Sequence, residues 1–238
     1  MILPREQDPL GAAIKDYYEG KQRAAIKVAS DRAVDDVLPA YYLFRGLDEM
    51  PDWEKRALDE CKGHVLDAGA GAGSHSLVLQ SRGYQVTALD VSLQATEVMR
   101  MRGIKDVLAG DLFSLPQSSY DTILLMMNGI GLVGDLDGLN SFLIAAKRLL
   151  APGGRILLDS SDLIFIYREA GLPAPDSGEY YGVVTYTMSY AGISGTPFKW
   201  LFVDYTRLRR HALAAGYTCE LLMEGPHYEY LAALTLVA

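Results

Sequence analysis

The fold is decided by Val65-Leu66-Asp67-Ala68-Gly69-Ala70-Gly71-Ala72-Gly73-Ser74. Two apolar residues lead into an acid, and glycine then recurs at every second position before a helix-like run. This pattern predicts a strand that ends in a tight turn and opens a helix. Glycine removes the Cβ atoms that would hold a ligand away from the backbone. We expect the N–H groups of the turn and the positive end of the helix to be free for a polar, nucleotide-like ligand.

Strand-like and helix-like segments alternate after this turn. Strands are predicted at residues 64–68, 84–89, 106–109, 120–127 and 155–158. Helices are predicted at residues 74–82, 92–103 and 139–150. The alternation is typical of an α/β fold with a doubly wound, mostly parallel sheet. In the tail we expect a hairpin within residues 180–203, a helix at 204–215 and two antiparallel strands at 217–223 and 228–237.

The expected organisation is a single domain over residues 1–238. Its parts are an N-terminal helical cap (1–60), a cofactor-binding core (61–160), a hairpin insertion or lid (161–205) and a C-terminal helix with strands that complete the sheet (206–238). Residues 21–38 are ambiguous between helix and irregular structure. Because both the cap and the insertion are rich in aromatic residues, we expect them to cover the site and exclude water.

Composition narrows the class of function. The chain has 22 Lys and Arg against 30 Asp and Glu, and its net charge of −8 argues against a large nucleic-acid footprint. No apolar run reaches transmembrane length, and the first residues lack the apolar centre of a signal peptide. Cys61 and Cys219 fit reduced thiols, which favours a cytoplasmic protein. From the charge and the lack of a long apolar run, we expect no nucleic-acid and no membrane partner. The oligomeric state is left open.

Three acids end successive predicted strands: Asp67, Asp90 and Asp111. In an open α/β sheet such residues line one crevice. Asp90 is placed to chelate two ribose hydroxyls, and Asp111 to reach an adenine amino group. A dinucleotide-binding turn would have glycine at position 74, where this chain has Ser74. Asp67 would also repel a pyrophosphate, so the pattern favours a ligand with ribose, adenine and a cationic amino-acid end.

These residues form part of a larger resemblance. The ordered motifs are Asp67-x-Gly69-x-Gly71-x-Gly73, Ala88-Leu89-Asp90-Val91-Ser92, Gly110-Asp111-Leu112, Tyr120-Asp121-Thr122-Ile123 and Leu150-Ala151-Pro152-Gly153-Gly154. Together they resemble class I S-adenosylmethionine-dependent methyltransferases, in particular uncharacterised bacterial members of the small-molecule type. The resemblance implies a Rossmann-like seven-stranded sheet of order 3-2-1-4-5-7-6, with the last strand antiparallel. It also implies S-adenosylmethionine as cofactor and S-adenosylhomocysteine as product.

The resemblance further implies a set of cofactor-binding residues. The turn, with Asp67, Gly69, Ala70, Gly71 and Gly73, would meet the methionine part. Asp90, beside Val91, would bind the ribose, whereas Asp111 and Leu112 would meet the adenine. Asn128 and Gly129 would lie near the sulfonium and its methyl group. Structural alternatives stay open: Asp67 also fits a role in tying the turn together, and Asp111 fits ordinary Gly-Asp turn chemistry.

The catalytic residues remain unknown from the sequence, because methyl transfer is an in-line displacement that needs a base only when the acceptor must lose a proton. The candidates are His227, Asp159 and Asp162, with an exposed turn or a helix cap as their structural alternatives. No metal site is expected. Asn128 is not followed by the Pro-Pro-Tyr of amino-group DNA methylases, which favours a small-molecule acceptor. Alternatives are a non-catalytic protein that binds the cofactor or its product and, less favoured, an NAD(P)-dependent oxidoreductase.

Three further side chains are candidates for the site. His75 opens the helix after the glycine turn and faces either the ligand or the neighbouring strand. Arg45 fits a contact with the donor's carboxylate or a surface salt bridge. Trp200 fits the wall of a substrate site or ordinary hairpin packing.

Overall fold

The computed structural model describes residues 2–32, 35–169, 171, 173 and 178–237. Its main feature is a seven-stranded sheet with the order β11-β12-β7-β6-β3-β4-β5. In chain order these strands are β3 (His64–Ala68), β4 (Gln85–Asp90), β5 (Asp106–Ala109), β6 (Tyr120–Leu125), β7 (Leu150–Ser161), β11 (Tyr217–Glu224) and β12 (Glu229–Leu236). Counted along the chain, this is the predicted order 3-2-1-4-5-7-6. β12 runs antiparallel to both β7 and β11, so this part of the prediction is confirmed.

The chain divides into two compact units, and each takes segments from distant parts of the sequence. The first comprises residues 1–51, 62–116 and 185–198, and the second comprises residues 52–61, 117–184 and 199–238. Strands β3, β4 and β5 belong to the first unit, whereas β6, β7, β11 and β12 belong to the second.

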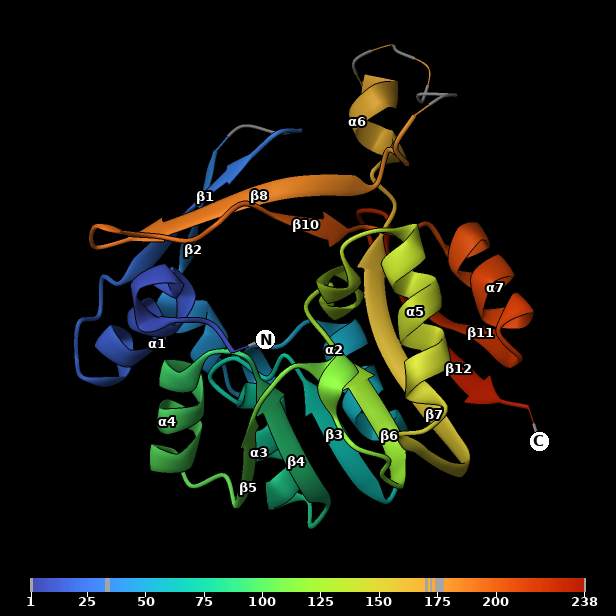
Figure 1. Ribbon diagram of the computed structural model, residues 1–238, viewed down its shortest axis with the longest axis horizontal. Helices are drawn as coiled ribbons and strands as arrows, with labels where there is room; N and C mark the ends of the chain where they lie inside the picture. The colour runs from blue at the N-terminus through green and yellow to red at the C-terminus, as the bar shows by residue number, and fades with distance from the viewer. Residues whose placement is uncertain (1, 33–34, 170, 172, 174–177, 238) are drawn as a thin grey trace. The chain divides into compact units, whose positions relative to one another are not determined.

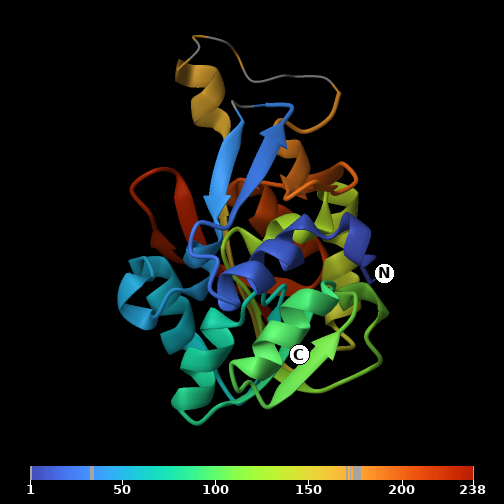
Figure 2. The same cartoon turned by 90° about the vertical axis from the view of Figure 1, so that its left-hand side faces the viewer.

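In the first unit, β3, β4 and β5 are parallel, with Val65 opposite Val86 and Thr87 opposite Asp106. The helices are α1 (Pro9–Tyr18), α3 (Ser74–Ser81) and α4 (Leu93–Met101), with 3-10 turns η1 (Arg5–Gln7), η2 (Ala40–Phe44), η3 (Leu47–Glu49) and η4 (Leu112–Ser114). Helix α1 packs against α4, and the two lie side by side in Figure 2. As the sequence predicts, Asp8 caps α1 with Pro9 in its first turn, and Ser92 caps α4.

Residues 21–38 are the main departure from the sequence-based expectation. They form the strands β1 (Ala25–Ser30) and β2 (Asp36–Pro39), which pair antiparallel. β1 also pairs with β8 (Val183–Tyr190), placing Lys27 opposite Ser189 (Figure 1). A second sheet of order β10-β8-β1-β2 results, with β9 (Ile193–Ser194) on β8 and β10 (Phe198–Leu201) at its edge. The N-terminal segment and the predicted hairpin insertion therefore share one sheet.

The second unit packs helices on β7 and its neighbours. Its helical segments are α2 (Asp52–Glu60), η5 (Gly129–Val133), α5 (Leu136–Ala146), α6 (Ile164–Glu169) and α7 (Tyr205–Ala214). Helix α5 contacts α7, whereas α2 contacts β7 and β12 (Figure 1). One boundary was predicted wrongly: α5 ends at Ala146, and β7 already begins at Leu150, because the turn at Pro152-Gly153-Gly154 lies inside the strand. The sequence also predicts a helix over residues 163–170; α6 accounts for it from Ile164 to Glu169, and position 170 lies outside the described residues.

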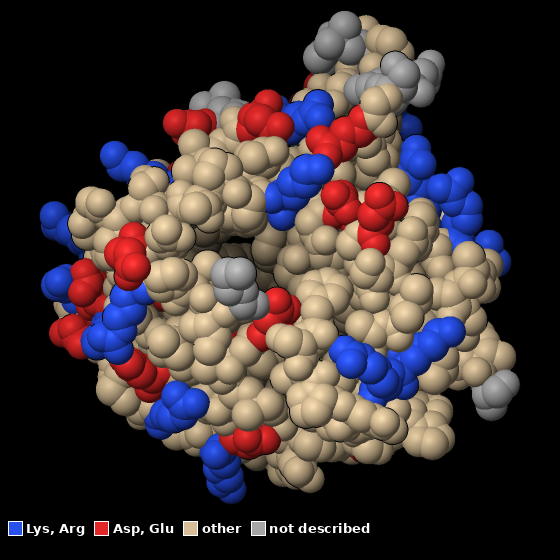
Figure 3. Space-filling model, in the orientation of Figure 1, with Lys and Arg blue, Asp and Glu red and all other residues tan. Residues whose placement is uncertain are grey.

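The surface mixes charges of both signs. On the face drawn in Figure 3, basic side chains lie among acidic ones. Lys199, for example, forms salt bridges with Asp135 and Glu179. Within the described part of the chain, no helix combines the length and apolar character needed to cross a membrane.

Candidate functional site

The three glycines of the turn after β3 have left-handed backbones, with φ of 77° at Gly69, 56° at Gly71 and 82° at Gly73. Their surroundings differ. A Cβ at Gly73 would overlap the side chain of Ile104, so this glycine serves the packing of the helix start. A Cβ at Gly71 would meet nothing within 4 Å. Gly71 therefore presents open backbone, as a turn that admits a ligand requires.

The N–H groups of this turn are used differently from the sequence-based expectation. The N–H groups of Gly69 and Ala70 both donate to the carbonyl of Leu89, at 2.9 and 3.0 Å. Gly71 donates to Asp90 Oδ2 at 2.8 Å, and Gly73 donates to the Ala70 carbonyl at 2.8 Å. The expectation that these groups are free was wrong, because the end of β4 takes three of them. The turn is thus fixed in shape by its neighbouring strand.

Asp90 joins the turn to the next helix. Its Oδ2 accepts from the Gly71 N–H and its Oδ1 from the Ser92 N–H, each at 2.8 Å. The side chain is 9% exposed, and burial raises its pKa to about 6 despite these two hydrogen bonds. An ionised carboxylate has about four acceptor positions, so both oxygens keep capacity for a ligand's hydroxyl groups.

Asp67 has the structural role that the sequence left open. It is 2% exposed, and its Oδ2 accepts from the Ser76 hydroxyl at 2.6 Å, which ties β3 to α3. Burial raises its pKa, and the nearby His75 acts in the opposite direction. His75 is itself buried and close to Asp67. A contact of Asp67 with a ligand's ammonium group stays a prediction.

At the end of β5, Asp111 caps the short turn η4, where its Oδ1 accepts from the Phe113 N–H at 2.9 Å. Leu112 is buried beside it. The carbonyl of Val91 accepts from the Leu3 N–H at 3.0 Å. The structure thus gives Asp111 the turn role considered for it, and its contact with an adenine remains a prediction.

The N-terminal segment packs directly on the glycine turn, which sequence reasoning did not locate. Ile14 shares a buried cluster with Ala72 of the turn, and Leu43 packs against that cluster. The Ser74 hydroxyl donates to the Leu43 carbonyl at 2.7 Å. The Ser92 hydroxyl donates to Asp8 Oδ2 at 2.6 Å, so the caps of α1 and α4 are joined. The segment expected to act as a cap is therefore bonded to the start of α3, directly after the glycine turn, and to the start of α4.

Arg45 lies at the end of this segment and is buried, so the surface position considered for its side chain was wrong. The residue is 6% exposed. Its guanidinium lies 3.6 Å from the centre of the Tyr42 ring, and its Nε donates to the Tyr42 carbonyl at 2.8 Å.

In the second unit, an unusual turn follows β6. Met127 and Asn128 both have positive φ, 62° and 56°, although neither is glycine. The Asn128 N–H donates to Asp159 Oδ1 at 2.8 Å, and Asp159 is 5% exposed at the end of β7. A Cβ at Gly131 would overlap the Trp200 indole, so this ring packs on the same segment. The structure thus brings together Asn128, Asp159 and Trp200.

The other catalytic candidates have the structural roles considered for them. Asp162 Oδ1 accepts from the Ile164 N–H at 2.9 Å, as a helix cap does, and from the Tyr181 hydroxyl at 2.7 Å. His227 is exposed in the turn between β11 and β12, where its N–H donates to Glu229 Oε2 at 2.7 Å. Catalytic roles for Asp162 and His227 remain predictions.

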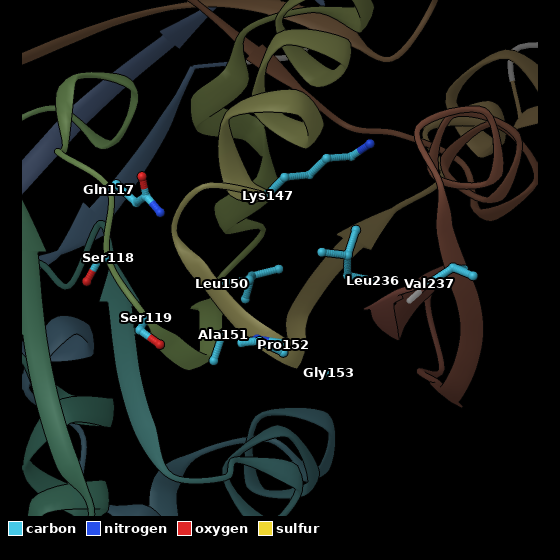
Figure 4. A pocket seen from close by; sticks show the side chains of 10 residues that line it. All are labelled: Gln117, Ser118, Ser119, Lys147, Leu150, Ala151, Pro152, Gly153, Leu236 and Val237. Carbon is cyan, nitrogen blue, oxygen red and sulfur yellow. The ribbon is translucent and has the colours of Figure 1, made fainter.

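A hollow of about 520 Å³ lies elsewhere in the second unit (Figure 4). Its walls include Gln117, Ser119, Lys147, Leu150 and Leu236. These residues lie near the beginnings of β6 and β7, whereas Asn128 and Asp159 follow or end those strands. Ligands of open α/β sheets bind at the carboxyl ends of the strands, so this hollow is not the candidate site.

Comparison with known proteins identifies the family of this chain. A family model described as a methyltransferase domain matches residues 66–158. Demethylmenaquinone methyltransferase of Tropheryma whipplei is 31% identical over 100 residues, which cover 40% of this chain and 40% of that protein. Ubiquinone biosynthesis O-methyltransferase of Xanthomonas oryzae pv. oryzae is 27% identical over 117 residues, covering 46% and 47%. The matched stretches thus span less than half of these curated relatives.

A solved structure gives a match over the full length. It is the SAM-dependent methyltransferase from Bacteroides fragilis in complex with S-adenosyl-L-homocysteine. The TM-score is 0.92 and the sequence identity is 40%, over 100% of this chain and 98% of that one.

Proposed function

Because the chain belongs to the S-adenosylmethionine-dependent methyltransferases, we propose that it transfers a methyl group from that cofactor to a small-molecule acceptor. The family implies S-adenosylmethionine as cofactor and S-adenosylhomocysteine as product. The observation that carries the proposal is the link between the glycine turn and Asp90: Gly71 is open on its outer side, and its N–H holds the Asp90 carboxylate. This arrangement suits a ligand that has both an amino-acid end and a ribose.

The proposed contacts follow the strand ends. The methionine part is held by Asp67 near the end of β3 and by the turn that follows, with Gly69, Ala70, Gly71 and Gly73. The ribose is held by Asp90 and Val91, and the adenine by Asp111 and Leu112. The sulfonium lies by Asn128 and Gly129. Support comes from the two turns taken separately: one follows β3 in the first unit, and the other follows β6 in the second unit. When bound, the cofactor supplies a methyl group that is already activated by the positive sulfur.

The residues of this chain then have to align the acceptor and exclude water. For the second task we propose the N-terminal segment and the hairpin insertion, as a lid within a single functional domain. The contacts of Ile14 and Leu43 with the turn region support this role, as does the pairing of β1 with β8. The names of the curated relatives suggest a quinone-related acceptor, but their matched stretches support only the broader class of small molecules. A cytoplasmic location and the lack of a nucleic-acid partner stay predictions.

The function is tested by binding and turnover together. Calorimetry should detect S-adenosylhomocysteine but not NAD(P), and S-adenosylmethionine should release its methyl group to a member of a metabolite library. Binding without any turnover would support the non-catalytic alternative. Binding of NAD(P) in place of S-adenosylhomocysteine would contradict the proposal.

The raised pKa of Asp90 predicts that binding depends on pH. A carboxylate accepts hydrogen bonds from ribose hydroxyls better than a carboxylic acid, so the ligand favours ionised Asp90. Because the pKa in the free protein is about 6, we expect affinity for S-adenosylhomocysteine to fall as pH drops below that value. Calorimetry between about pH 5 and 8 checks this. In Asp90→Asn the affinity should be lower and should lose this dependence; a variant that keeps it would show that another group titrates.

Trp200 should report on binding. Its indole packs on Gly131, in the segment that follows Asn128. We expect its fluorescence to change when S-adenosylhomocysteine binds. The chain has two tryptophans, so Trp53→Phe should keep the change and Trp200→Phe should lose it. Unchanged fluorescence at a saturating ligand concentration would show that Trp200 does not lie at the binding site.

A further inference from the structure

The turn after β6 contains a buried hydrogen-bond acceptor with no partner. Asn128 Oδ1 is shielded from solvent, and among the described residues nothing donates to it. The amide nitrogen lies 3.5 Å from the carbonyl oxygen of Leu201. Turning the amide over would place its oxygen against the Leu201 carbonyl oxygen, so this contact favours the orientation that leaves Oδ1 unpaired. Buried polar atoms of this kind are rare and call for an explanation.

The backbone of the same turn is strained. Met127 and Asn128 are consecutive residues with left-handed φ, a conformation that glycine adopts far more readily. The Asn128 N–H is held by Asp159 at the end of β7. Strain that is maintained by surrounding contacts is typical of functional positions. Two independent observations, the unpaired oxygen and the strained turn that presents it, therefore point to Asn128 as a ligand-binding residue.

We propose that Asn128 Oδ1 accepts a hydrogen bond from the N–H of an amine substrate, and that the methyl acceptor is accordingly a neutral primary or secondary amine. This inference rests on the proposed function and names the substrate class of the same site. An amine carries both a hydrogen to donate and a lone pair to react. Holding the N–H on Asn128 orients the nitrogen while its lone pair stays free.

The reaction is balanced without a base. The nitrogen lone pair forms the new N–C bond, and the electrons of the S–C bond return to sulfur, which leaves a neutral thioether. The product is a methylated ammonium ion, which gives its extra proton to water after release. Positive charge thus moves from sulfur to the nitrogen that Asn128 holds.

The position of Asp159 favours an amine over a hydroxyl acceptor. A neutral amine gains positive charge as it is methylated, and a nearby buried carboxylate favours that charge. A hydroxyl acceptor would instead need a base to take its proton, and Asp159 Oδ1 already accepts the Asn128 N–H. Two more acids, Asp162 and Asp204, belong to the same unit as Asp159. The carboxylate of Asp162 accepts from the Tyr181 hydroxyl, and that of Asp204 accepts from the Tyr180 hydroxyl.

The test uses the whole protein with S-adenosylmethionine and a panel of paired probes, each an amine and the alcohol of the same carbon skeleton. Methyl transfer should occur to amines and not to their alcohol partners. The rate should rise with pH as each amine loses its proton. Transfer to alcohols alone, or to no amine of the panel while S-adenosylhomocysteine still binds, would overturn the assignment. Failure to bind S-adenosylhomocysteine would instead count against the proposed function.

Asn128→Gly separates a substrate contact from a structural role. Glycine suits the left-handed backbone, so the melting temperature should be unchanged or higher. Loss of the amide should lower kcat/KM for the amine at least tenfold, while the variant still binds S-adenosylhomocysteine, which lacks the methyl group beside which we place Asn128. Asn140→Ala, an exposed asparagine of α5, is the matched control and should change neither quantity. Full activity in Asn128→Gly would contradict the inference.

Discussion

Gly71→Val is expected to abolish binding of S-adenosylhomocysteine. The backbone of Gly71 has φ of 56°, a conformation in which a β-branched residue is a clear outlier. Forcing an L-residue into it costs about 1–2 kcal/mol. The open space outside Gly71 is also where we propose that the ligand approaches, and a valine side chain would fill it. A shift of the turn would weaken the bond from the Gly71 N–H to Asp90 as well.

Gly83 provides a matched control for this substitution. It also has positive φ, 89°, and a Cβ there would likewise meet nothing within 4 Å. It lies beyond the other end of α3, just before β4. Gly83→Val should therefore lower the melting temperature by a similar amount while leaving affinity intact, as measured by calorimetry. Normal binding by Gly71→Val would show that this turn does not hold the ligand.

The elements that could be predicted from sequence are those specified by local patterns. β3 and its turn are encoded within residues 65–74, and the caps Asp8 and Ser92 lie next to the helices they begin. The acids Asp67, Asp90 and Asp111 lie at or just after the ends of predicted strands, and the carboxyl ends of parallel strands share one edge of a sheet. These features need no knowledge of distant contacts.

The parts that escaped prediction depend on distant contacts. β1 is only six residues long, and its partner β8 lies more than 150 residues away, so its pairing leaves little local signal. The bond from Ser74 to Leu43 and the one from Ser92 to Asp8 join residues 31 and 84 positions apart. Truncation of residues 1–45 should therefore lower the melting temperature as well as the activity, because it removes the fully buried Ile26.

The hydrogen bonds made by the N–H groups of the glycine turn show why a sequence motif does not define the whole geometry of a binding site. Glycine spacing indicates that the backbone is accessible, but it does not say which groups are already bonded. Leu89 and Asp90 take the N–H groups of Gly69, Ala70 and Gly71. The contribution of the turn is therefore shape and the orientation of Asp90, more than a row of free donors.

Asp90→Ala is expected to weaken S-adenosylhomocysteine binding severely while the fold persists. Two ribose hydroxyls bonded to a charged group contribute about 1.5–3 kcal/mol each. Their loss corresponds to roughly a hundredfold or greater fall in affinity, which calorimetry can measure. Asp106→Ala is the control: this acid belongs to the start of the neighbouring strand β5, and its removal should leave affinity unchanged.

The effect of Asp90→Ala on stability should be small, because two contributions oppose each other. Removing the carboxylate leaves the N–H groups of Gly71 and Ser92 without their acceptor, which destabilises the fold. However, burial raises the pKa of Asp90 from its usual 3.8 to about 6. The protonated form of Asp90 therefore stabilises the fold below about pH 4, and this stabilisation is lost as pH rises through 6. At pH 7 the buried, ionised side chain lowers the free energy of unfolding, and alanine removes this unfavourable contribution. We therefore expect a melting temperature close to that of the parent at pH 7 together with severely weakened binding. A variant that unfolds would make Asp90 a structural residue, and one that binds normally would remove it from the site.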